Sequence, residues 1–127
     1  MVRVGYQHFA FLGDESQWSA EASECAAEQN AFWEYHDALF AGQSGENQGA
    51  FNKDKLKGFA AGLGLDTAAF DECVESGKYA TLVANQTQYL QSLGVQSTPT
   101  FVVNGQALVG AQPFEAFQQL IESELNK

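Results

Sequence analysis

The sequence predicts an α/β domain in which one strand is followed by five helices, a β-hairpin and a last helix. Three observations predict it. Residues 3–9 alternate in a period of two and are rich in β-forming types. Apolar residues recur at helical spacing between residues 16 and 93. Asn104-Gly105 joins two short apolar runs, which is typical of a type I′ hairpin turn. With 127 residues, 45% of them hydrophobic, the chain is long enough to bury the core of one domain.

The strand predicted over residues 3–9 has no hairpin partner, because Leu12-Gly13-Asp14 breaks the pattern directly after it. The first helix is expected to begin near Ser16, with Asp14 and Glu15 beside its start. A second helical pattern covers residues 32–40 and stops at Gly42.

Residues 42–51 are polar and glycine-rich, and we expect an exposed loop there. Asn52 and Asp66 are suitable N-caps for the third and fourth helices, and a fifth pattern covers residues 78–93. The apolar stripes of the first four predicted helices place both cysteines of the chain toward a core. The members of these stripes are Trp18, Ala22, Cys25 and Ala26; Phe32, Tyr35, Leu39 and Phe40; Leu56, Phe59, Ala60 and Leu63; and Phe70, Cys73 and Val74.

Near residue 100 the spacing of apolar residues changes from that of a helix to that of strands. Residues 100–103 and 106–109 are predicted to be the two strands of the hairpin. Pro113 lies near the start of a last amphipathic helix that ends near Leu125.

The charge of the chain limits its partners. Six lysines and arginines oppose sixteen aspartates and glutamates, so the net charge is −10, which disfavours binding to nucleic acids and anionic membrane surfaces. No apolar run is long enough to span a bilayer, and the first residues lack the apolar stretch of a signal peptide. Carboxylates at helical spacing, among them Glu15, Glu21, Glu24 and Glu28, are interpreted as a solvated face.

Metal binding and other common chemistries find no support in the sequence. His8 and His36 are far apart, and neither has a second histidine or cysteine at ligand spacing, so no metal site is predicted. We interpret His36 as a histidine of the helix surface or of the packing. No nucleophile elbow, phosphate loop or metal motif is present.

One segment of the sequence resembles a known protein family. The residues Gly94-Val95-Gln96-Ser97-Thr98-Pro99-Thr100-Phe101 are similar to the cis-proline loop of thioredoxin-fold proteins. Residues 9–13, 21–29 and 32–40 resemble the insert helices of the DsbA-like branch of thiol-disulfide oxidoreductases, apart from Ala10, where that branch usually has proline. The resemblance implies an α/β thioredoxin-like domain over residues 1–127, with a DsbA-type helical insert over 14–93 and the hairpin and last helix over 98–127.

In such a family the residues equivalent to Thr98 and Pro99 face the substrate beside the redox disulfide. A cis bond between them orients the backbone of residue 98 toward an extended substrate, and it costs an X-Pro bond only about 0.5 to 1 kcal/mol. The alternative is a trans proline that begins an edge strand.

The family's Cys-x-x-Cys motif is absent. Cys25 and Cys73 are too far apart to form it, so no catalytic residue is predicted within the chain. The resemblance places the motif on a strand and helix before Met1, which makes this a partial domain, truncated at its N-terminus and inactive by itself. A missing central strand would leave a gap in the sheet, and we expect either strand exchange between copies in a homodimer or a rearranged sheet.

Three interpretations of Cys25 and Cys73 remain open. A structural disulfide is favoured, because an even cysteine count in an extracytoplasmic type of family indicates a bridge and similar DsbA-like proteins often pair these positions. The others are two buried free thiols and a regulatory redox pair.

The resulting functional hypothesis is a portion of a DsbA-like oxidoreductase that exchanges disulfides with thiol- or disulfide-containing proteins, without a cofactor. Its parent would be periplasmic or otherwise extracytoplasmic, and any membrane anchor would be a segment outside this chain. One alternative is a noncatalytic thioredoxin-like module that binds peptides. Another is a fragment related to the glutathione-dependent kappa-class transferases and isomerases.

Overall fold

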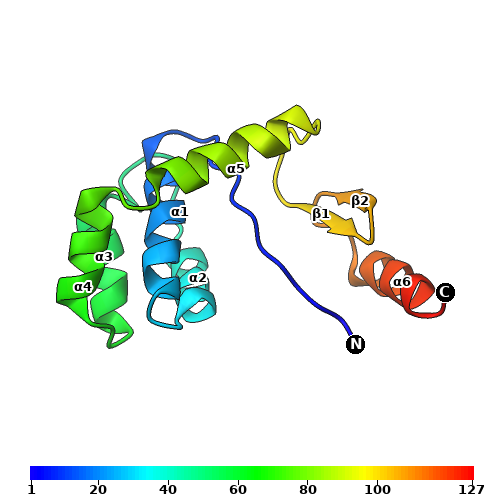
Figure 1. Ribbon diagram of the computed structural model, residues 1–127, viewed down its shortest axis with the longest axis horizontal. Coiled ribbons are helices and arrows are strands. Elements are labelled where there is room, and N and C mark those ends of the chain that lie inside the picture. The colour runs from blue at the N-terminus through cyan, green and yellow to red at the C-terminus, as the bar shows by residue number, and fades with distance from the viewer. The chain divides into compact units, whose positions relative to one another are not determined.

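The computed structural model describes all residues from 1 to 127 and consists of two compact units. The helical unit comprises residues His8–Gln88, and the hairpin unit comprises Met1–Gln7 together with Tyr89–Lys127. Helix α5 crosses from the first unit into the second (Figure 1). The elements are α1 (Asp14–Ala27), α2 (Phe32–Ala41), α3 (Lys53–Gly62), α4 (Thr67–Ser76), α5 (Ala80–Ser92), β1 (Thr100–Val103), β2 (Gln106–Val109) and α6 (Phe114–Leu125).

The helical unit holds the core of the chain. Helix α1 packs against α2, α3 and α4, and α3 packs against both α2 and α4, as their positions in Figure 1 show. Apolar side chains from these four helices and the α1–α2 turn meet in one buried cluster. Its members are Ala22, Cys25, Ala26, Ala31, Tyr35, Leu56, Ala60, Phe70, Cys73 and Val74. Most members of the predicted stripes face this core, but the prediction is wrong for Phe40 and Leu63, which are 68% and 39% exposed.

Two of the predicted N-caps are confirmed. The Asn52 side chain accepts a hydrogen bond from the Lys55 amide at 2.9 Å, and the Asp66 side chain accepts one from the Ala69 amide at 3.1 Å. Each cap satisfies one of the amides that the first turn of a helix leaves unpaired. Ser16, in contrast, lies inside α1, whose N-cap is Gly13 with no side-chain cap.

The hairpin unit contains the predicted β-hairpin. Strands β1 and β2 pair antiparallel, with Val103 opposite Gln106 and Thr100 opposite Val109. Asn104 and Gly105 both have positive φ angles, of 48° and 86°, as the tight turn requires. Helix α6 lies against β1 through an edge-to-face contact between Phe101 and Phe117, with ring centroids 4.7 Å apart. None of the residues of α6 is fully buried.

The predicted strand over residues 3–9 is wrong, because this segment has no regular secondary structure and the sheet has only two strands. Alternation supplies only the tendency to extend, whereas a strand also needs a neighbour for its backbone groups. At the end of the segment, side chains of α5 accept the hydrogen bonds that a neighbouring strand would otherwise accept. The His8 amide donates to the Gln86 Oε1 at 2.9 Å, and the Ala10 amide donates to the Thr87 Oγ1 at 3.0 Å.

Candidate functional site

The loop before β1 carries Thr98 and Pro99, the two residues that the family resemblance predicts to face a substrate. Thr98 and Pro99 are exposed, and the peptide bond between them is cis. Two short hydrogen bonds hold the loop in place: the Gly110 amide donates to the Pro99 carbonyl at 2.8 Å, and the Thr100 hydroxyl donates to the Ser97 carbonyl at 2.7 Å. Pro99 is therefore fixed to the open end of the hairpin.

One edge of β1 has unpaired backbone groups. Since Val103 and Gln106 close a two-residue turn, hydrogen bonding alternates along the hairpin, and the amides and carbonyls of Thr100 and Val102 point away from β2. No strand lies on that side, because the sheet consists of β1 and β2 alone. The backbone of Thr98 makes no hydrogen bond within the chain. Together these groups can accept an added extended strand.

The cysteines lie in the helical unit, where a disulfide joins Cys25 of α1 to Cys73 of α4. Their Cα atoms are 5.9 Å apart, and only 1% of Cys25 and 6% of Cys73 is exposed. No cysteine of the chain is free, so residues 1–127 supply no thiolate to attack a substrate disulfide.

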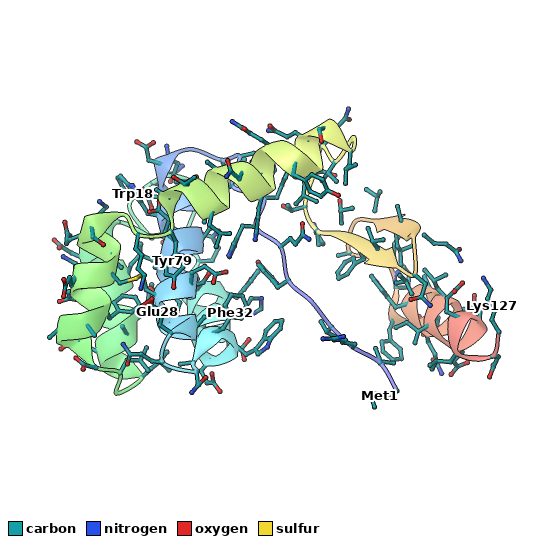
Figure 2. All side chains as sticks on the ribbon, viewed as in Figure 1. Met1, Trp18, Glu28, Phe32, Tyr79 and Lys127 are labelled. Carbon is teal, nitrogen blue, oxygen red and sulfur yellow. A yellow bond between two sulfur atoms is a disulfide. The ribbon has the colours of Figure 1, made fainter.

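A polar recess of about 290 Å³ lies next to this disulfide. It is lined by Glu28, Ala69, Glu72, Cys73, Ser76 and Lys78. The Glu28 carboxylate accepts hydrogen bonds from the Lys78 ammonium group and, at 2.7 Å, from the Tyr79 hydroxyl; Glu28 and Tyr79 are labelled in Figure 2. These two donors lower the pKa of Glu28, and the bond to Glu28 raises the pKa of Tyr79 from 10.0 to about 12.

The Tyr79 titration gives a direct prediction. In Glu28→Gln, the pKa of Tyr79 should fall from about 12 toward 10.0, because the neutral amide no longer opposes the charge of the phenolate. Titration of tyrosinate absorbance measures the change, and Tyr79→Phe identifies the transition by removing it. An unchanged high-pH transition in Glu28→Gln would show that this carboxylate does not control Tyr79.

The two histidines each lie beside one carboxylate. His8 is 4% exposed, and its Nε2 is 2.8 Å from the Glu24 Oε1; the His36 Nδ1 is 3.0 Å from the Asp37 Oδ1. No group of three histidine, cysteine or carboxylate side chains could hold a metal ion. Both rings also contact aromatic neighbours: His8 lies 6.4 Å from Phe32, and His36 lies 4.8 Å from Phe40.

Several acidic side chains that were predicted to lie on a solvated face are buried or bonded within the chain. Glu15 is only 8% exposed and binds the glycine-rich loop, accepting from the amides of Gly49 and Phe51 at 2.7 Å each. Glu21 is equally buried and accepts from the Gln17 side chain, while Glu24 pairs with His8. The partners of Glu15 and Glu24 lie outside their own helix, so helical spacing could not reveal them.

Comparison with known proteins agrees with this geometry. A family model described as thioredoxin matches residues 1–123. The chain belongs to the thioredoxin family. BdbD from Bacillus subtilis, in its oxidised crystal structure, superposes with a TM-score of 0.81 and 25% identity, over 92% of this chain and 65% of BdbD. The thioredoxin-like α/β fold and the DsbA-like resemblance are thereby confirmed.

Two curated relatives extend the comparison. Disulfide bond formation protein D from Bacillus subtilis is 24% identical over 98% of this chain and 57% of its own length. A Na⁺/H⁺ antiporter NhaA from Salinispora arenicola is 36% identical over 85% of this chain but only 16% of its own length. This thioredoxin-family chain thus spans less than two thirds of either relative, and none of its helices is both long and apolar enough to cross a membrane.

Proposed function

We propose that this chain is the substrate-contacting portion of a protein thiol-disulfide oxidoreductase, in which Thr98 and Pro99 face the substrate. The attacking thiolate comes from a Cys-x-x-Cys segment outside residues 1–127, because both cysteines of the chain are in the Cys25–Cys73 disulfide. The single observation that carries this proposal is the exposed Thr98-Pro99 loop at an open strand edge in a thioredoxin-family chain.

The edge explains how a protein substrate is recognised without sequence specificity. An extended polypeptide that adds to β1 gains hydrogen bonds to backbone groups, which are the same in every substrate. Residue 98 lies at the end of this edge with its amide and carbonyl unpaired within the chain. A substrate strand placed there runs past the exposed Pro99.

The oxidised cysteine pair supports an extracytoplasmic location for the protein. Structural disulfides persist in oxidising compartments and are rare in the cytosol. Disulfide exchange with exported proteins takes place in the same compartments. Cys25 and Cys73 are structural in this proposal, since they tie α1 to α4 in the helical unit and carry no thiol chemistry.

A photo-crosslinking amino acid in place of Thr98 tests the substrate contact. We expect cross-links to a reduced, unfolded protein, and few to the same protein when it is folded, because only an extended segment can pair with β1. The matched control is the same amino acid at Leu63, which is 39% exposed on the helical unit. Equal yields from positions 98 and 63 would contradict the assignment of Thr98.

The same open edge supports a homodimer formed by strand exchange, with the extended residues 3–9 of one copy beside β1 of the other. Light scattering should then detect a dimer that dissociates on dilution. A chain that stays monomeric at high concentration would exclude this form of assembly.

A noncatalytic peptide-binding module is the second candidate. The similarity to a Na⁺/H⁺ antiporter favours this candidate. The name of that relative describes ion exchange and not disulfide exchange, and this chain matches only 16% of its length. The coding sequence upstream of Met1 separates the candidates. An in-frame Cys-x-x-Cys after a strand supports the oxidoreductase, a serine in place of its first cysteine supports a glutathione enzyme, and a start codon at Met1 supports the binding module.

A further inference from the structure

A carboxylate of α6 is bonded to the closed end of the β-hairpin. The Gln106 side chain donates to the Glu124 Oε1 at 2.6 Å, and the Asn104 side chain donates to the Glu124 Oε2 at 3.2 Å. The Lys127 ammonium group also donates to the Oε1, at 2.6 Å. Only 9% of the Glu124 side chain is exposed. Both carboxylate oxygens therefore have donors, and two of the three donors belong to the hairpin.

Helix α6 is attached to one face of the hairpin at two places. Because side chains alternate between the faces of paired strands, Phe101 of β1 and Gln106 of β2 lie on the same face. Phe101 packs on Phe117 of α6, and Gln106 binds Glu124 of α6. Phe117 and Glu124 are separated by about 10 Å along the helix, at 1.5 Å per residue. One attachment thus lies on β1, and the other lies at the turn.

The second attachment decides how firmly the open edge of β1 is oriented. None of the residues of α6 is fully buried, so α6 and the hairpin share no closed core that would fix them by packing. With the ring contact alone, the hairpin can rotate about Phe101 and Phe117. With the Glu124 bonds at the turn as well, it cannot. An edge that is already oriented costs an incoming strand less ordering entropy than a mobile one.

The contacts of Glu124 favour its ionised form. The hydrogen bonds from Lys127 and Asn104 lower the pKa of Glu124 below its ordinary 4.5. An ionised carboxylate accepts through both oxygens, which suits three donors, whereas a glutamine in its place has one accepting oxygen and an amide group that donates. The site at the turn therefore requires a carboxylate rather than any polar side chain of the same size.

We propose that Glu124 is a positioning residue for the substrate edge formed by Thr98, Pro99 and β1. It contacts no substrate itself. Through Asn104 and Gln106 it holds the hairpin on α6 in the orientation that an extended substrate meets. This role rests on the proposed function, because it concerns the same edge. Loss of the carboxylate weakens substrate binding without removing the binding residues.

Cross-linking from position 98 to a reduced, unfolded protein, measured against the concentration of that protein, tests the proposal. We expect the concentration for half-maximal yield to rise about 3- to 10-fold in Glu124→Ala, because binding must then order a mobile edge. The maximal yield should stay the same, since the edge itself is intact. Glu124→Gln should lie between the native chain and Glu124→Ala, because its amide keeps one accepting oxygen.

Glu122→Ala is the matched control, because Glu122 is exposed on the same helix and accepts a hydrogen bond from Gln118 of that helix. It should leave the half-maximal concentration unchanged, and circular dichroism should show every variant to be folded. An unchanged half-maximal concentration in Glu124→Ala would overturn the proposal, as would an equal rise in Glu122→Ala. A lower maximal yield in Glu124→Ala would mean that the edge is lost rather than reoriented, and would equally overturn it. Absence of cross-links from the native chain would instead contradict the proposed function, and this role with it.

Discussion

Replacing Cys25 and Cys73 together by alanine should lower the free energy of unfolding by about 4 kcal/mol. The disulfide closes a loop between residues 48 positions apart, and the unfolded chain loses that constraint when the bond is absent. A loss of this size is a large fraction of the stability of an ordinary domain. Chemical denaturation followed by circular dichroism measures it in the native protein and the double variant.

Reductant provides the internal control for this prediction. It should destabilise the native protein and leave the Cys25→Ala, Cys73→Ala variant unaffected. Alkylation should label neither thiol of the folded, untreated protein, because both cysteines are oxidised and buried. Labelling of both thiols without reductant, or a loss of stability below about 1 kcal/mol, would contradict a stabilising disulfide.

Tyr35→Ala should lower the free energy of unfolding by about 3 to 5 kcal/mol, the range for removing a buried aromatic ring. Tyr35 is fully buried, its ring is 5.4 Å from that of Phe70, and its hydroxyl donates to the Leu56 carbonyl at 2.8 Å. Tyr35→Phe keeps the ring and loses only the hydrogen bond, so its cost should be about 1 kcal/mol. Urea unfolding of the two variants separates packing from hydrogen bonding.

The same residue makes stability depend on alkaline pH. Burial raises the pKa of Tyr35 above its ordinary 10.0, so the folded state keeps a proton that the unfolded state releases. The free energy of unfolding should therefore fall as the pH rises above about 10, and it should fall less steeply in the Tyr35→Phe variant.

Phe40→Ala is the control for Tyr35→Ala on the same helix, because Phe40 is 68% exposed and its removal should cost less than about 0.5 kcal/mol. Equal losses from Tyr35→Ala and Phe40→Ala would contradict the central place of Tyr35 in the core.

Local signals in the sequence predicted much of the fold. Asn52 and Asp66 mark the starts of α3 and α4 because a cap needs only its own side chain and an amide three residues on. Asn104-Gly105 predicts the hairpin because the turn depends on two backbone conformations. The apolar stripes of α1 and α4 correctly placed Cys25 and Cys73 toward one core, because the spacing of apolar residues along a helix indicates its buried side.

Features that depend on distant partners were missed. The alternation of residues 3–9 predicted a strand, but it carried no information on whether a neighbouring strand exists, and none does. The amides of His8 and Ala10 donate to the side chains of Gln86 and Thr87 instead. Glu15 has the spacing of a surface residue, yet its carboxylate binds amides more than 30 positions away. Phe40 was predicted on the inner stripe of α2 but is 68% exposed, because apolar character alone does not show which end of a helix the core covers.

The central claim is that this thioredoxin-family chain contributes the Thr98-Pro99 surface to a disulfide oxidoreductase and holds no redox-active thiols itself. Insulin reduction driven by dithiothreitol, measured for residues 1–127 and for the complete product of the gene, tests it most directly. We predict no acceleration above the reductant alone for residues 1–127, and clear turnover for the complete product. Turnover by residues 1–127, or none by the complete product, would contradict the account.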